Sequence, residues 1–267
     1  MKNKLILSDA EKLGRLVNEA GLSRSDIARA LEVGYKTVYR WIDKGIRPQP
    51  VHSRHIDGLF KEHVDLTPVV ERLKGRIGDP IRALKTNAAA RDRLFLAMTY
   101  NSNAIEGSRM TLKETWKAIS GQSVRGREFF EVLEAVNHDN ALKYLLETVR
   151  PGYRIDESYI LKLHSIVMYS FSDKLPGKYR TGYVNLTDAE VRLPSAQMVP
   201  LKMKEFLRSI NRYQRNPVGK IAADHYAFEA IHPFFDGNGR VGRLIMATQL
   251  LSRGYPPALI QASDRHK

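Results

Sequence analysis

The stretch His232-Pro-Phe-Phe-Asp-Gly-Asn-Gly-Arg-Val-Gly-Arg243 constrains the fold of this chain more than any other part of its sequence. Apolar runs flank it, which predicts a short loop that leads into a helix running to Leu251. Gly237 and Gly239 surround Asn238, and glycine tolerates the left-handed backbone angles that turn successive N–H groups inward at a helix start. The stretch therefore predicts an anion-binding loop.

The polar side chains of the same stretch suit a phosphate ligand. Arg240 and Arg243 lie three residues apart on the first helical turn and can reach one anion from one face. Asp236 offers the kind of oxygen ligand that Mg²⁺ accepts beside substrate phosphates, and His232 is placed to remove a proton. Taken singly, these features are also typical of an ordinary turn and a solvated helix face.

In this order and spacing, the stretch resembles the signature of the Fic family, His-x-Phe-x-Asp/Glu-Gly-Asn-Gly-Arg-x-x-Arg, at every defining position. A second match lies at the end of a long helix predicted over residues 87–107. By pattern alone, Ser102 and Glu106 share one face of an ordinary helix end, with Gly107 as its C-cap. The segment nevertheless resembles the family's inhibitory motif, Ser/Thr-x-x-x-Glu-Gly/Asn, in the form that precedes the catalytic core. Together the matches cover roughly residues 87–263.

The resemblance implies transfer of AMP from ATP to a Ser, Thr or Tyr hydroxyl of a target protein. His232 would be the base and Asp236 would hold Mg²⁺ between the α- and β-phosphates. The loop of residues 237–239, together with Arg240, would hold the diphosphate leaving group. Glycine at position 239, where phosphorylating family members carry lysine, implies adenylyl transfer.

The inhibitory motif implies autoinhibition. Arg243 would bind the γ-phosphate, and Glu106 would compete with that phosphate by pairing with the arginine. In some relatives the same glutamate positions the water that removes AMP, so de-AMPylation also stays open.

Between Pro176 and Pro200 the pattern changes from helical to extended, and a turn-like centre predicts a β-hairpin over residues 183–194. It can be read as a surface hairpin on a helical protein. The resemblance instead makes it the flap that docks the target segment by strand addition. The candidate docking residues are Tyr183, Val184, Asn185, Leu186, Val191 and Leu193.

Residues 8–45 predict three short helices. Ser8 and Ser23 are each followed three residues later by an acid, as in a capping box. Ala28, Val38 and Trp41 belong to the buried set of a helix-turn-helix. The opposite face of the last helix would meet a DNA major groove, and its residues are Lys36, Thr37, Arg40 and Lys44.

The segment resembles the N-terminal helix-turn-helix of many bacterial regulators and indicates DNA binding through residues 23–45. A homodimer would then be needed, because one such unit contacts too little DNA. The alternative is a small helical adaptor whose Lys and Arg side chains are solvated.

The whole sequence predicts a mainly α protein. We expect a helix-turn-helix at residues 1–50, a linker at 51–66 that follows Pro48 and Pro50, and a Fic-type helical bundle with a small hairpin flap at 67–267. The family core usually continues into further helices, whereas this sequence ends at Lys267, which implies a truncated chain or a minimal core.

The net charge of +14 favours a polyanionic partner, and the lack of cysteine excludes disulfides and thiolate chemistry. No segment is long enough for a signal peptide or a membrane span, so we expect a cytoplasmic protein without a membrane partner.

Two functional hypotheses follow. The first is a Mg²⁺- and ATP-dependent protein adenylyltransferase, which the intact His232, Asp236 and Arg240 favour. The alternative is a DNA-binding transcriptional regulator whose Fic-like core binds nucleotide without significant catalysis.

Overall fold

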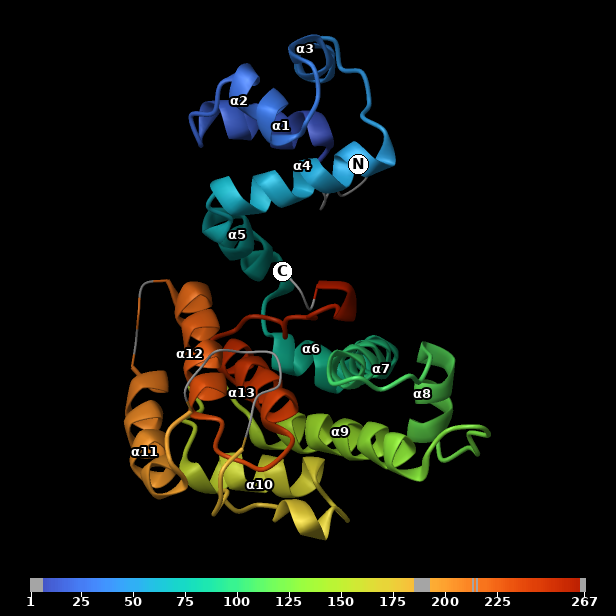
Figure 1. The fold of residues 1–267 in the computed structure, drawn as a ribbon, viewed down its shortest axis with the longest axis vertical. Coiled ribbons are helices and arrows are strands. Elements are labelled where there is room, and N and C mark those ends of the chain that lie inside the picture. The colour runs from blue at the N-terminus through green and yellow to red at the C-terminus, as the bar shows by residue number, and fades with distance from the viewer. Residues whose placement is uncertain (1–6, 185–192, 213, 215, 265–267) are drawn as a thin grey trace. The chain divides into compact units, whose positions relative to one another are not determined.

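The computed structural model describes residues 7–184, 193–212, 214 and 216–264, and its chain divides into two compact units, Met1–Arg72 and Leu73–Lys267 (Figure 1). The division falls within one helix, α5 (Thr67–Ile77). Among the described residues the regular structure is entirely helical, which confirms the mainly α prediction. No helix in this part of the chain is both long and apolar enough to cross a bilayer.

The first unit contains the three helices predicted from the capping patterns: α1 (Asp9–Asn18), α2 (Arg24–Ala30) and α3 (Tyr35–Asp43). Both capping boxes form, because Ser8 and Ser23 accept the N–H groups of Glu11 and Asp26 while those carboxylates bind back to the serine N–H groups. Val38 and Trp41 are buried as expected.

The predicted linker over residues 51–66 is wrong, since α4 occupies Pro50–His63. Pro50 stands at the first helical position, where its missing N–H costs nothing, so this proline starts a helix instead of breaking one. Ile56 and Phe60, one helical turn apart, are buried in the same core as Leu13 and Leu16 of α1.

The second unit is built from α6 (Pro80–Thr86), α7 (Ala88–Ile105), α8 (Leu112–Ile119), α9 (Phe129–Thr148), α10 (Glu157–Val167), α11 (Val199–Ile210), α12 (Pro217–Ile231) and α13 (Asn238–Ser252), with short 3-10 turns at Ser172–Lys174, Ala196–Met198 and Ala262–Asp264. The long helix predicted over residues 87–107 is therefore present as α7.

Helix α13 lies at the centre of this unit and contacts α7, α9, α10 and α12 (Figure 1). Its side chains are buried on nearly every side, as expected for a helix surrounded by others. The core around it includes Phe95, Leu142, Leu163, Phe228 and Leu244. The predicted anion-binding loop is the connection from α12 into this central helix.

Candidate active site

The loop between α12 and α13 is held in place by its own residues. His232 ends α12 with a left-handed φ of 48°, and Gly237 precedes α13 with a φ of 76°. Between them Phe234 is fully buried. Asn238 closes the loop, because its Oδ1 accepts the Phe234 N–H and its Nδ2 donates to the Phe234 carbonyl, each at 2.9 Å.

This closure limits what Asn238 can do for a ligand. We predicted Asn238 as a nucleotide-binding residue, but its side chain is 2% exposed and both of its polar atoms are used within the loop. Only its backbone N–H remains for the predicted role. The side chain instead supports the loop from inside.

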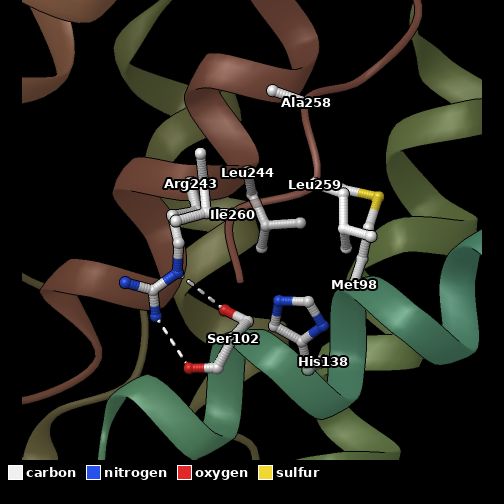
Figure 2. Close-up of a pocket in the computed structure, with 8 residues that line it drawn as sticks. All are labelled: Met98, Ser102, His138, Arg243, Leu244, Ala258, Leu259 and Ile260. Carbon is white, nitrogen blue, oxygen red and sulfur yellow. Dashed lines mark hydrogen bonds between the residues drawn. The ribbon is translucent and has the colours of Figure 1, made fainter. Parts of the chain in front are cut away.

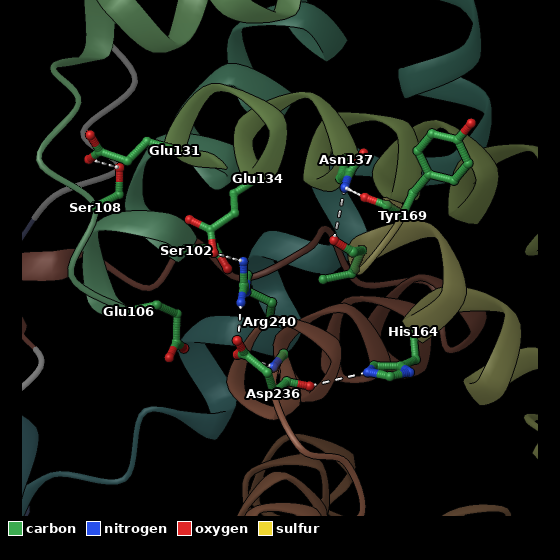
Figure 3. A network of polar contacts seen from close by, with 12 residues as sticks. Ser102, Glu106, Ser108, Glu131, Glu134, Asn137, His164, Tyr169, Asp236 and Arg240 are labelled. Carbon is green, nitrogen blue, oxygen red and sulfur yellow. Dashed lines mark hydrogen bonds and ion pairs between the residues drawn. The ribbon is translucent and has the colours of Figure 1, made fainter. Parts of the chain in front are cut away.

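His164 of α10 packs against the loop between α12 and α13. Its ring stacks on Phe234 with centroids 3.7 Å apart. Its Nδ1 accepts the Gly177 N–H at 2.9 Å, so the ring proton is on Nε2, which lies 3.2 Å from the carbonyl oxygen of Asp236 (Figure 3). Burial lowers the pKa of His164 to about 4, so the ring is neutral at pH 7.

Arg240 joins the loop to α9. Its Nη1 donates to Glu134 at 2.6 Å and its Nη2 to the Asp236 carboxylate at 3.1 Å (Figure 3). The guanidinium is 2% exposed and its Nε has no hydrogen-bond partner in the described chain. Glu134 thus pairs with Arg240, and no local sequence pattern predicts this contact.

Arg243 is bound to the end of α7. Its Nε donates to Ser102 Oγ and its Nη2 to the Ser102 carbonyl, each at 2.9 Å, and Nη2 also reaches Glu106 Oε1 at 2.6 Å. Gly107 follows with a φ of 101°, which suits its expected position after the helix end. Two residues of the predicted inhibitory motif, Ser102 and Glu106, therefore contact Arg243.

Glu106 also lies directly over the start of α13. A Cβ added at Gly239 would collide with Glu106 Oε1. Because the backbone of residues 237–239 is the predicted anion nest, the carboxylate occupies space beside the N–H groups that an anion would approach.

A small cavity of about 20 Å³ adjoins the Arg243–Ser102 contact (Figure 2). This volume is enough for about one water molecule. Its lining residues are Met98, Ser102, His138, Arg243, Leu244, Ala258, Leu259 and Ile260. Burial lowers the pKa of His138 to about 3, so a neutral imidazole lies beside the arginine.

Several effects act on the pKa of His232. Burial lowers it, and a hydrogen bond from the ring to the Glu229 carbonyl acts in the opposite direction. In the neutral ring that bond uses the single N–H group, and the other nitrogen carries the lone pair that can accept a proton. Arg180 lowers the pKa further, whereas Glu106 and Asp236 raise it.

Burial also raises the pKa of the Glu229 carboxyl to about 7. Its Oε1 has no hydrogen-bond partner among the described residues.

The other predicted residues divide between described and undescribed parts of the chain. Tyr183, Val184 and Leu193 have no regular structure, and Tyr183 is 81% exposed. Asn185, Leu186 and Val191 lie outside the described residues, as does most of the predicted hairpin.

On α3, Lys36 and Arg40 are exposed and Thr37 is half-buried, whereas Val38 and Trp41 are buried. Lys44, the C-cap of α3, is also exposed. Sequence reasoning missed the exposed Tyr35 and Tyr39 on the same helix.

Comparison with known proteins identifies the domain around this loop. Residues 154–250 match the family model described as Fic/DOC family. A crystal structure of a Fic domain containing signaling protein from Bacteroides thetaiotaomicron is 26% identical, with a TM-score of 0.60 over 66% of this chain and 69% of that chain. Residues 154–250 therefore form a domain of the Fic/DOC family.

The curated relatives are named protein adenylyltransferase Fic. The one from Nematostella vectensis is 33% identical over 192 residues, which cover 70% of this chain and 44% of the relative. The one from Drosophila erecta is 33% identical over 190 residues, 68% of this chain and 38% of the relative. This chain therefore matches less than half the length of these relatives.

Proposed function

We propose that this protein transfers AMP from ATP to a hydroxyl group of a target protein, and that Glu106 restrains the reaction. The observation that carries the proposal is the contact of Glu106 with both Arg243 and Gly239, which sets a carboxylate where the loop could otherwise receive a phosphate. The names of the curated relatives support the same activity.

In the proposed reaction the hydroxyl oxygen attacks the α-phosphorus of ATP and its proton passes to the free ring nitrogen of His232. The bond from the α-phosphorus to the bridging oxygen breaks, and diphosphate leaves. Its charge would be stabilised by the N–H groups of Asn238 and Gly239 and by Arg240, because the Gly237 N–H already donates to the Asp236 carboxylate. Because burial lowers the pKa of His232, the ring is unprotonated and ready to act at neutral pH.

Mg²⁺ fits the residues present. Asp236 has a side chain that is 43% exposed, and Arg240 contacts its Oδ1. The described residues contain no group of three metal-ligating side chains, which suits an ion bound by one carboxylate and substrate phosphates. Asp236 would hold the ion, which would neutralise phosphate charge.

Substitution of Glu106 tests the proposal directly. The wild type, Glu106→Gly and Glu106→Gly/His232→Ala proteins are incubated with Mg²⁺ and ATP labelled on the α-phosphate, and self-labelling is measured. The contact between Arg243 and Glu106 is a charge-assisted hydrogen bond whose arginine is 12% and whose glutamate is 37% exposed. A hydrogen bond to a charged group contributes about 1.5–3 kcal/mol, so we expect labelling to rise by about tenfold or more in Glu106→Gly. His232→Ala should abolish it.

Glu128→Gly is the matched control. Glu128 lines the same groove as Glu106, and glycine is tolerated at its N-cap position. This variant should label like the wild type. Equal labelling of folded wild type and Glu106→Gly would contradict the proposed restraint by Glu106. Labelling that persists in the variant with His232→Ala would contradict the proposed role of His232 as the base.

The exposed basic face of α3 favours a second function, binding of double-stranded DNA by a homodimer. Lys36 and Arg40 lie one turn apart on this face, and the chain is strongly basic. We expect Arg40→Ala to weaken binding of a labelled duplex in fluorescence anisotropy and to reduce its salt dependence. Lys61→Ala, on the exposed surface of α4, is the control, and an equal loss in both variants would contradict a role for α3.

A further inference from the structure

Arg180 is a buried arginine whose side chain reaches three separate parts of the second unit. It is 3% exposed. Its Nε donates to the His232 carbonyl at 2.8 Å, its Nη1 to the Gly182 carbonyl at 3.0 Å, and its Nη2 to the Pro194 carbonyl at 2.6 Å. Its backbone N–H donates to the Pro233 carbonyl at 2.9 Å.

The charge of Arg180 has no carboxylate partner among the described ion pairs of the chain. Burial lowers its pKa, but a guanidinium stays charged in proteins. Burying a charged guanidinium is costly, so a purely structural role would be served more cheaply by apolar packing. What arginine supplies instead is a rigid, planar set of donors that can bind several carbonyls at once.

Two of these carbonyls mark the ends of the predicted docking segment. Gly182 precedes residues 183–193 and Pro194 follows them, so a single guanidinium binds both ends. The third carbonyl belongs to His232, which has the left-handed φ of 48° that is strained for a side chain other than glycine. Arg180 therefore binds the residue whose unusual backbone sets the direction of the base.

We propose that Arg180 is a positioning residue that holds Gly182 and Pro194 in fixed places relative to the base His232. This inference rests on the proposed adenylyl transfer, because it concerns how a docked hydroxyl meets the base. A displacement of about 1 Å between reacting groups can reduce a rate by roughly 100-fold. Loss of the hydrogen bonds that hold these three carbonyls in place should therefore slow the transfer.

The charge of Arg180 has a second effect on the same base. After burial, it is one of the influences that lower the pKa of His232, against the opposite effects of the Glu229 carbonyl, Glu106 and Asp236. The guanidinium thus helps to keep the imidazole neutral.

The test replaces Arg180 by lysine in the Glu106→Gly protein. Lysine keeps the charge but cannot span three carbonyls with fixed donors. The matched control is Arg253→Lys, because Arg253 at the other end of α13 also donates to backbone carbonyls, those of Gln249 and Ile210. Burial lowers the pKa of Arg253 as well. Self-labelling rates, melting temperatures and Mg²⁺-ATP affinity by calorimetry are measured for all three proteins.

We expect both lysine variants to melt at lower temperature and to bind Mg²⁺-ATP as the parent does. Only Arg180→Lys should label more slowly, by about 10- to 100-fold, at a temperature where all three are folded. Equal rates for Arg180→Lys and its parent, or equal losses in both lysine variants, would overturn the proposal. A parent that does not label itself would instead contradict the proposed transfer.

A measurement that does not depend on transfer keeps the inference testable in that case. The ring of His232 is titrated by NMR in the parent, Arg180→Met and Arg253→Met proteins. Removing the charge at position 180 should raise the pKa of His232, and removing it at position 253 should leave that pKa unchanged. The same pKa in the parent and Arg180→Met would show that the guanidinium does not act on His232.

Discussion

Ser102 offers the sharpest test of how Arg243 is restrained. Arg243 donates three hydrogen bonds to the end of α7, and Ser102→Ala removes only the one from Nε to Ser102 Oγ. The arginine side chain is 12% exposed, so this bond is largely shielded from water. A hydrogen bond to a charged group contributes about 1.5–3 kcal/mol, and the lower value corresponds to roughly a tenfold shift between restrained and released states.

We therefore expect Ser102→Ala to raise self-labelling by about tenfold in the otherwise wild-type protein, less than Glu106→Gly does. The expectation requires that Arg243 leave Ser102 when it binds a phosphate. In the Glu106→Gly background the restraint is already gone, and Ser102→Ala should have little further effect. The four proteins form a double-mutant cycle, and labelling with α-phosphate-labelled ATP is measured for each.

Two outcomes would refute this reasoning. No change in the wild-type background would mean that Arg243 keeps its contact with Ser102 in the active state. The same proportional change in both backgrounds would mean that Ser102 acts on catalysis and not on the restraint. Circular dichroism of each variant checks that α7 remains folded.

Two further predictions concern histidines. Burial lowers the pKa of His232, so the labelling rate of Glu106→Gly should decline in acid with an apparent pKa below the ordinary histidine range. An apparent pKa above that range would contradict a neutral base. Burial lowers the pKa of His164 to about 4 in the folded protein. Between about pH 6.5 and 4 the unfolded chain therefore binds more protons than the folded chain does. The free energy of unfolding should fall by about 3 kcal/mol as the pH drops through that window. His164→Phe, which keeps a ring on Phe234, should flatten this pH dependence in urea melts followed by fluorescence, and an unchanged slope would contradict the assignment.

The sequence predicted those features that depend on neighbouring residues. The capping boxes at Ser8 and Ser23 and the helix leading from Gly237 are local patterns, and the structure contains them. The linker was wrong because Pro50 has the same appearance in sequence whether it ends a helix or starts one. Only the burial of Ile56 in the core of the first unit distinguishes the two.

The residues that sequence reasoning missed act over long separations. Glu134 contacts Arg240, and His164 stacks on Phe234, although each pair lies far apart in the chain. The hydrogen bonds of the Arg180 side chain within the described residues all go to backbone carbonyls, which leave no charge pattern in the sequence. Such contacts exist only once the helices have packed, so no local pattern could reveal them.

The burial of α13 on nearly every side also determines where this unit can open. Its backbone amides should exchange with deuterium only when the whole unit unfolds, since no side of the helix can separate locally from its neighbours. The end of α7 is different, because Glu106 has a side chain that is 37% exposed and Gly107 is exposed. Amides there should exchange by local fraying, so deuterium uptake should report release of the glutamate while the helix that bears Arg243 stays protected.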